Sequence, residues 1–322
     1  MTDTAGMTAS HAAHERTPSR VVVLAALTAN VGVALLKLVA AGLTGSSAMV
    51  AESLHSIADT ANEVLLLVGG RRALRPADHL HPFGHARFSY VYAFMVSLAV
   101  FWIGGVLAVL EGVTHLNTAE SVLDPAFALA ILGVSAVFES ASLTVTLRTT
   151  GPSRRGRRWR DVIRSTKVPE LIVVFLEDVG ALIGIAIAAA GVGLTAATGN
   201  PVWDAVASIA IGVLLMGIGA RIFRETQSLL IGEAADEETT SKIMEAILGT
   251  DGIRGTENLR TIHVGPTNLV VDAVVLVDGE QTARAIVAAI AEAEASVRRA
   301  TDFAVEIYLE PRVAEPGPVT DD

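Results

Sequence analysis

The sequence contains no cysteine among its 322 residues, so disulfide bridges, thiolate zinc sites and cysteine nucleophiles are all excluded. Charged residues make up only 18% of the chain and aromatic residues only 5%, whereas 51% are hydrophobic. A mean hydropathy of +0.51 fits a protein with several membrane spans and a soluble appendage better than a globular enzyme. We find no nucleophile elbow, phosphate loop or HExxH motif, and no basic patch interleaved with aromatic residues that would indicate nucleic acid. We therefore expect neither an enzyme, nor a prosthetic group, nor a nucleic-acid partner.

Six apolar stretches are long enough to cross about 30 Å of hydrocarbon as helices. They run from Val21 to Gly42, Ser47 to Gly70, Phe88 to His115, Val122 to Leu147, Val168 to Ala190 and Pro201 to Phe223. These stretches predict an α-helical integral membrane domain with six transmembrane helices over residues 21–230. The preceding residues 1–20 are polar and lack an apolar core, so we expect a cytosolic tail there rather than a cleaved signal peptide.

Positive charge is missing from every second loop. The loops after the first, third and fifth stretches contain no Lys or Arg, whereas those after the second and fourth contain four and eight. The positive-inside rule therefore predicts that both termini lie in the cytosol. Residues 148–167 form the larger basic segment, which we interpret as a cytosolic linker that sets topology and contacts the anionic headgroups of membrane lipids. The expected location is a bacterial plasma membrane.

The pattern after Phe223 is that of a small soluble domain, which we place at residues 231–312, with a flexible tail at 313–322. Residues 236–248 and 280–299 read as helices, and residues 254–264, 268–277 and 303–309 read as strands. The order αββαβ predicts a cytosolic α+β, ferredoxin-like domain with both helices on one face of a sheet. From Glu233 onward the sequence has 18 Asp and Glu against 7 Lys and Arg, so the acidity of the chain is concentrated there.

Ionisable residues interrupt the second and fifth apolar stretches. His55, Asp59 and Asn62 follow each other at helical spacing, so they share one stripe of the second helix. Measured along the helices, His55 and Asp59 lie about 12 and 18 Å from the outer face, and Glu177 and Asp178 lie about 15 Å from the inner face. All four therefore fall near the midplane, where an imidazole and carboxylates can form a site for a divalent cation.

Other interpretations of these residues remain open. The cluster could instead be hydrogen-bonded and serve only to lock two helices together. Glu177 points about 100° away from Asp178 around the helix, so it is either a ligand or a packing residue. Asn62 is more easily explained as an interhelical hydrogen-bonding group, or as a partner of a ligand, than as a direct ligand. Weaker candidates are Glu139, Asn30 and Lys37, and Asp204 is expected only to mark the outer interface.

A second cluster lies in the cytosolic turn after the second stretch. Asp78, His79, His81 and His85 fall within eight residues, in a segment bent by Pro82 and Gly84. These side chains could converge on one metal ion, or the histidines could cap helix ends in a purely conformational turn.

These residues carry a family resemblance. The HSxxDxxN pattern of residues 55–62, the HPFGHARF turn of residues 81–88, six spans and an αββαβ tail resemble the cation diffusion facilitator family over roughly residues 21–312. The chain looks most similar to the branch that includes the mitochondrial zinc exporter, whose fifth span also has a Leu-Glu-Asp element. The resemblance implies a homodimeric exporter that exchanges a divalent metal, usually zinc, for protons by alternating access.

Carried over position by position, the resemblance implies transport-site ligands at His55, Asp59 and Asp178. The first ligand of the fifth span falls on Val174, and Glu177 is the candidate to supply the missing oxygen. The loop metal site of bacterial members matches Asp78, His81 and His85. The dinuclear site of the family's cytosolic domain falls on Glu257, Ala273, Tyr308 and Glu310, so the resemblance implies a tail that dimerises rather than a strong metal sensor.

Zinc is the expected metal, with manganese or iron as the alternative because the midplane set is rich in oxygen. Protons compete with metal for the same lone pairs, which couples export to proton return. Two other classes of protein fit the sequence less well. A carrier of organic cations would need a roomy aromatic cavity, which the low aromatic content disfavours, and a non-transporting membrane partner would have no use for an intact midplane site.

Overall fold

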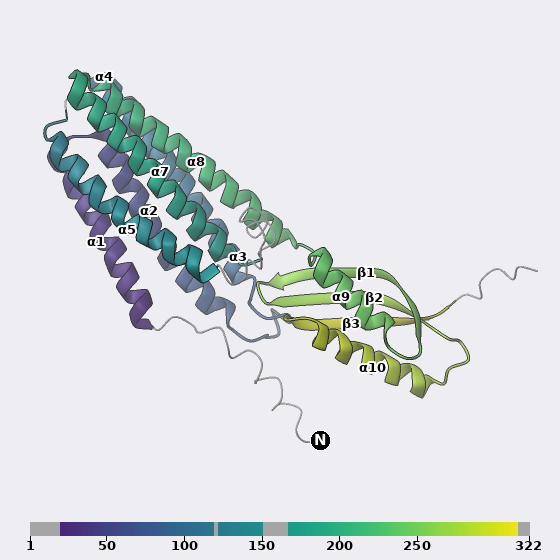
Figure 1. The fold of residues 1–322 in the computed structure, drawn as a ribbon. Coiled ribbons are helices and arrows are strands. Elements are labelled where there is room, and N and C mark those ends of the chain that lie inside the picture. The colour runs from purple at the N-terminus through teal and green to yellow at the C-terminus, as the bar shows by residue number, and fades with distance from the viewer. Residues whose placement is uncertain (1–19, 119–121, 151–166, 315–322) are drawn as a thin grey trace, which may run out of the picture.

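The computed structural model describes residues 20–118, 122–150 and 167–314 (Figure 1). The predicted N-terminal tail, the basic linker at 148–167 and the C-terminal tail fall almost entirely outside the described residues. Within the described part, a helical bundle is followed by a smaller domain of helices and strands at one end of the bundle (Figure 1).

Long helices occupy the positions of the predicted spans. They are α1 (Arg20–Thr44), α2 (Ser47–Ala73), the continuous helix of α3 (Phe88–Ala99), η1 (Val100–Val106) and α4 (Leu107–Thr118), α5 (Pro125–Thr150), α7 (Pro169–Thr198) and α8 (Val202–Ile231). Successive helices run antiparallel, so the turns at residues 45–46 and 199–201 lie at the end remote from the smaller domain, and the turn at 74–87 lies next to it (Figure 1).

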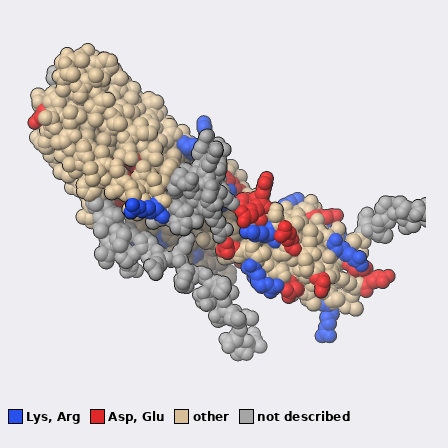
Figure 2. Space-filling model, viewed as in Figure 1, with Lys and Arg blue, Asp and Glu red and all other residues tan. Residues whose placement is uncertain are grey.

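Four of these helices are long and apolar enough to cross a membrane, namely Phe88–Thr118, Pro125–Arg148, Pro169–Thr198 and Val202–Ile231. Helix α2 has the length but carries several ionisable residues, and the apolar stretch described in α1 is the shorter Asn30–Thr44. In Figure 2 the bundle surface is mostly free of charge, whereas Lys, Arg, Asp and Glu gather over the smaller domain and the adjoining end of the bundle. The chain is therefore a multi-pass membrane protein with a polar appendage.

The third predicted span contains a π-helical segment, η1, that the sequence did not indicate. At this segment, η1 and α8 pack against each other at glycine residues. A Cβ atom on Gly105 would lie 2.9 Å from the backbone nitrogen of Met216, and one on Gly212 would lie 2.7 Å from the carbonyl oxygen of Gly105. Only glycine allows the backbones of η1 and α8 to approach this closely, as small residues do in membrane helix pairs.

The predicted αββαβ order is confirmed in the smaller domain. It consists of α9 (Glu237–Leu248), β1 (Ile253–Gly265), β2 (Asn268–Val277), α10 (Ala283–Ala300) and β3 (Ala304–Val313). Strand β2 is central, antiparallel to β1 and parallel to β3. Alternate residues of β2 from Leu269 to Val277 are buried, as expected when one face of a strand meets a helix layer. Ile243 and Ile247 of α9 and Val297 of α10 complete that core.

Candidate functional site

A polar cavity of about 60 Å³ lies among α1, α2, α5 and α7. Its lining is mostly polar or ionisable: Asn30, Val33, Ser56, Asp59, Glu63, Glu139, Ser142, Val174, Glu177 and Asp178. Asp178 is about 14 Å from the first residue of α7, and Glu63 is about 15 Å from the last residue of α2. Both ends lie on the side of the smaller domain, so the cavity occupies the half of the bundle that faces that domain.

His55 and Asp59, both on the α2 stripe, lie at different places relative to the cavity. Asp59 lines the cavity, whereas His55 is buried one turn nearer the remote end of the bundle. The Nδ1 atom of His55 and the Oδ1 atom of Asp59 are 3.4 Å apart. Neither ring nitrogen of His55 has a hydrogen-bond partner among the described residues. The imidazole can therefore offer a ring nitrogen to a metal ion.

Glu177 and Asp178 face different neighbours, as their angular offset on the helix requires. Glu177 accepts a hydrogen bond of 2.6 Å from the amide nitrogen of Asn62 on α2. Asp178 accepts hydrogen bonds of 2.9 Å from the hydroxyl groups of Ser142 and Thr146 on α5. Asn62 is thus an interhelical donor, and the α7 acids connect α2 to α5 around the cavity.

The four midplane residues predicted from the sequence are therefore near neighbours but not a closed ligand shell in this conformation. Asp59, Glu177 and Asp178 share one cavity, and His55 lies just outside its lining. Among the described residues, only one group of three His, Asp or Glu side chains has ligand atoms all within 4.8 Å of one another, and it is the loop cluster Asp78, His81 and His85.

The loop cluster is held by its own backbone. Asp78 Oδ1 accepts hydrogen bonds from the backbone N–H groups of Leu80 at 2.9 Å and His81 at 2.7 Å. The bond from His81 contributes most to lowering the pKa of the Asp78 carboxyl below its usual range, so the group stays ionised in weakly acidic solution. Gly84 adopts a φ of +79°, which allows the chain to turn back toward Asp78.

The spacing of these ligand atoms suits a zinc ion. Bond lengths of about 2.0–2.1 Å in a tetrahedral site separate neighbouring ligand atoms by about 3.4 Å. Asp78 Oδ1 lies 3.2 Å from His81 Nδ1, and Asp78 Oδ2 lies 3.5 Å from His85 Nε2. The other ring nitrogen of His85 lies 3.0 Å from the carbonyl oxygen of Pro76, a contact that fixes the orientation of a metal-binding imidazole. His79 is exposed and is not part of the group.

Among the cavity residues, Asn30 and Glu139 were only weak candidates from the sequence, and Glu63 was not singled out. Asn30 donates a 2.8 Å hydrogen bond to Glu63, which places α1 against the α2 stripe. Glu139, the one acid in the sequence of α5, lines the cavity. Glu63 lies one turn beyond Asp59, so extending the helical spacing of the stripe would have found it.

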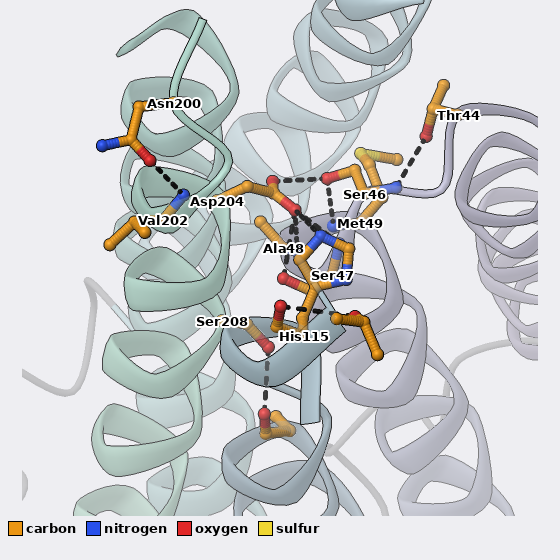
Figure 3. Close-up of polar contacts among 12 residues, drawn as sticks. Thr44, Ser46, Ser47, Ala48, Met49, His115, Asn200, Val202, Asp204 and Ser208 are labelled. Carbon is orange, nitrogen blue, oxygen red and sulfur yellow. Dashed lines mark hydrogen bonds and ion pairs between the residues drawn. The ribbon is translucent and has the colours of Figure 1, made fainter. Parts of the chain in front are cut away.

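The sequence predicts that Asp204 only marks the outer interface, but the structure shows another role. Its side chain is fully buried and binds the first turn of α2 (Figure 3). Asp204 accepts hydrogen bonds from the Ser46 hydroxyl at 2.6 Å and from the Ser47 backbone N–H at 2.5 Å. His115 Nε2 lies 3.9 Å from the same carboxylate. The expectation was wrong because the start of a helix presents unpaired N–H groups that a carboxylate from another helix can satisfy.

The smaller domain holds few metal ligands at the positions that the family resemblance singled out. Glu257 and Glu310 both contact the guanidinium group of Arg312, at 3.2 and 4.0 Å. A cation at this place would compete with arginine. His263 is buried, packs edge-on against Phe303 and has a pKa lowered chiefly by burial, so its ring belongs to the packing of the domain.

The bundle, its acidic cavity and its polar domain define a multi-pass membrane protein with a cytoplasmic domain. Residues 23–231 match the family model of the cation efflux transmembrane domain, and residues 235–312 match that of the cytoplasmic domain of cation efflux proteins. The chain therefore belongs to the cation diffusion facilitator family, and the resemblance found in the sequence is confirmed.

Curated relatives come from both eukaryotes and bacteria. The mitochondrial proton-coupled zinc antiporter SLC30A9 of Xenopus laevis is 30% identical over 250 residues, which are 77% of this chain and 45% of that protein. Metal tolerance protein C4 of Arabidopsis thaliana is 30% identical, with 69% of this chain and 49% of the relative covered. The cation-efflux pump FieF of Serratia proteamaculans is 31% identical, with 73% and 74% covered. The chain spans about half the length of the first two relatives.

Proposed function

We propose that this protein exports a divalent metal ion, Zn²⁺ in the first place, from the cytosol in exchange for protons. The observation that carries the proposal is the cavity in which Asp59, Glu177 and Asp178 come together from α2 and α7. Burying ionised carboxylates at this depth costs free energy unless a cation or protons neutralise them. A transport cycle alternates between the metal-bound and the protonated state. The names of the SLC30A9 and FieF relatives support the same class of reaction.

In the proposed cycle, metal ions enter the cavity from the side of the cytoplasmic domain. The carboxylates of Asp59, Glu177 and Asp178 bind the ion, and His55 supplies an imidazole one turn farther out. Protonation of His55 and of a carboxylate would release the ion at the outer face, since protons and metal share the same lone pairs. The return of these protons to the cytosol would drive the next turnover.

The loop cluster is proposed as a second metal site at the cytosolic mouth. Asp78, His81 and His85 would hold the ion there, and a bound zinc ion would crosslink the turn between α2 and α3. This turn contacts the cytoplasmic domain, because a Cβ atom on Gly265 would lie 2.3 Å from the Cβ atom of Ala86. Metal at the loop can therefore stiffen the junction between the two domains.

The proposed topology has six spans with both termini in the cytosol of a bacterial cell. Helices α1 and α2 complete the set, and α2 has a low hydropathy because it carries the transport stripe rather than because it lies outside the membrane. The match to a family model of dimerising cytoplasmic domains supports a homodimer.

Reconstituted vesicles test the transport proposal. Zinc and proton movements are followed together with a zinc dye inside and a pH dye outside, under an imposed pH gradient. Wild-type protein should exchange Zn²⁺ for protons, and His55→Ala and Asp178→Ala should each lower the rate to the level of empty vesicles. His79→Ala is the matched control and should keep the wild-type rate. Wild-type rates from either midplane variant would contradict the proposed site.

Manganese and iron are the alternative cargo, because one imidazole with several carboxylates accommodates them better than a nitrogen-rich zinc site does. Competition between Zn²⁺ and equal concentrations of Mn²⁺, Fe²⁺, Co²⁺ and Cd²⁺ in the same vesicles decides between them. Zinc is expected to be transported fastest.

A further inference from the structure

A fully buried ion pair lies on the outer side of the transport cavity. The ammonium group of Lys37 on α1 donates a hydrogen bond of 2.9 Å to Glu52 Oε2 on α2, and neither side chain has any exposed surface. The proposed transport cycle uses neither residue. Replacing such a pair by apolar groups of similar size is often neutral or stabilising, so fold stability alone is a weak reason for its presence.

Glu52 extends the α2 stripe by one turn. Glu52, His55 and Asp59 follow each other at helical spacing, so their side chains share a face, and Glu52 lies about 10 Å nearer the outer end than Asp59. Each member of the stripe has a buried atom without a hydrogen-bond partner among the described residues: Glu52 Oε1, both ring nitrogens of His55 and Asp59 Oδ1. Apart from the 3.4 Å contact between His55 Nδ1 and Asp59 Oδ1, these potential ligand atoms have no partner, and they form a row that runs outward from the cavity.

The unused oxygen of Glu52 points at α7, the helix that also carries Asp178. A Cβ atom on Gly184 would lie 2.5 Å from Glu52 Oε1. Gly184 therefore leaves just enough room for this carboxylate between α2 and α7. The same two helices hold the transport acids on the inner side and Glu52 on the outer side.

We propose that Glu52 is a cation ligand on the exit side of the transport cavity, and that Lys37 is a tethered cation that occupies it until the metal arrives. This inference rests on the proposed transport function. A divalent ion leaving Asp59 would pass the imidazole of His55 and reach Glu52 Oε1. Its charge repels the ammonium group of Lys37, which frees the second carboxylate oxygen. When the metal has left, Lys37 returns and the buried carboxylate is neutralised again.

A paired substitution separates this role from a merely structural one. Lys37→Met combined with Glu52→Gln keeps the size of both side chains and leaves no unpaired charge. If the ion pair were only structural, the double variant would match the wild type in both thermal stability and zinc flux. We expect the stability to be retained, the zinc affinity measured from the cytosolic side to stay within about threefold, and the zinc flux into vesicles to fall at least tenfold. A wild-type flux in the double variant would overturn the proposal.

Two further variants keep the test decisive if the double variant folds poorly. Gly184→Ala preserves both charges and pushes the carboxylate of Glu52 away, so zinc flux should fall while cytosolic zinc binding persists. Gly193→Ala on the same helix meets no atom within 4 Å and should transport normally. Wild-type flux in Gly184→Ala would overturn the proposal. If wild-type protein moved no metal at all, the transport function itself would fail, an outcome distinct from wild-type flux in these variants.

The exposed pair of Lys242 and Glu238 provides a control of the same chemistry. Their side chains are 2.8 Å apart on α9, and each is about half exposed. Lys242→Met with Glu238→Gln should leave zinc flux unchanged. This result assigns the loss in the membrane pair to its position beside the stripe rather than to the removal of a Lys–Glu contact.

Discussion

Val174 lines the proposed transport cavity beside Glu177 and Asp178 without offering a ligand atom. The family resemblance implies that the first ligand of the fifth span falls at this position. The consequence is a cavity in which carboxylate oxygen outnumbers imidazole nitrogen, a composition that reduces the preference for zinc over harder metals.

Val174→His should therefore increase the preference for zinc. An added imidazole in the cavity favours Zn²⁺ over Mn²⁺, because imidazole suits zinc and carboxylate suits manganese. We expect the ratio of zinc to manganese affinity to rise about tenfold, which corresponds to about 1.4 kcal/mol. Isothermal titration of the detergent-solubilised protein with each metal measures it. Val174→Leu adds volume without a ligand atom and serves as the control. An unchanged ratio in Val174→His would show that residue 174 does not face the bound ion.

Glu233 and Lys167 form an ion pair between the start of α7 and the segment after α8. Partial burial, the largest single influence, works to raise the pKa of Glu233. The hydrogen bonds from Lys167 and Ser228 and the charges of Lys167 and His263 together outweigh burial, so the pKa is lowered. A carboxyl with a lowered pKa in the folded state stabilises the fold above its ordinary pKa, and this stabilisation is lost as the pH falls through the lowered value.

A double-mutant cycle with Glu233→Gln and Lys167→Met should show this pH dependence. At pH 7.5 we expect a coupling of about 0.5–1 kcal/mol in thermal unfolding, because both side chains are only partly buried. The coupling should shrink as the pH falls below the ordinary glutamate range. A coupling that stayed constant down to pH 3 would mean that packing, and not charge, joins these residues.

At the scale of the elements, Asp204 connects the outer end of α8 to the first turn of α2. Asp204→Ala would leave the backbone N–H groups of Ser47 and Ala48 without their carboxylate acceptor. We expect a loss of about 2–3 kcal/mol in stability, because these bonds are buried and charge-assisted. Thermal unfolding in detergent measures it. Asp124→Ala removes an exposed cap of α5, where Asp124 accepts from Phe127, and should cost only about 1 kcal/mol. Equal losses in the two variants would contradict a special role for Asp204.

The elements of the cytoplasmic domain could be predicted closely from the sequence, because the alternating run of β2 and the amphipathic pattern of α10 each favour one structure. The membrane helices were harder to delimit. The fifth predicted span ends at Ala190, which leaves residues 191–200 as a loop, yet α7 continues to Thr198. Gly191 lies against α8 there, where a Cβ atom would be 2.4 Å from that of Ala207, so tertiary packing overrides a poor local propensity.

Only part of the candidate site could be predicted from the sequence, for a related reason. Helical spacing brings His55 and Asp59 onto one stripe, and depth brings Glu177 and Asp178 near them. Spacing does not give the rotation of one helix against another, so the sequence could not tell that Asp178 faces α5 or that Lys37 pairs with Glu52. The π-helical segment and the burial of Asp204 depend on contacts with a distant helix in the same way.

At the scale of the whole molecule, the charge distribution and the antiparallel helices support one orientation in the membrane. The turn at 74–87 and the cytoplasmic domain share one end of the bundle, and the start of α5 lies at the other (Figure 1). Metal loading at the loop cluster and contact with the cytoplasmic domain would then both take place on the cytosolic side, and release past Glu52 would take place on the opposite side.

The absence of cysteine allows this orientation to be tested cleanly. Leu74 and Leu123 are exposed by 83% and 80% and lie in turns at opposite ends of the helix Phe88–Thr118. A membrane-impermeant maleimide applied to intact cells should label Leu123→Cys and not Leu74→Cys, whereas both should react after permeabilisation. Val313→Cys, at the end of β3, should behave like Leu74→Cys, and the wild-type chain should stay unlabelled. The reverse pattern would mean that the protein has the opposite orientation in the membrane. Labelling of both loops in intact cells would mean that this helix does not cross the membrane.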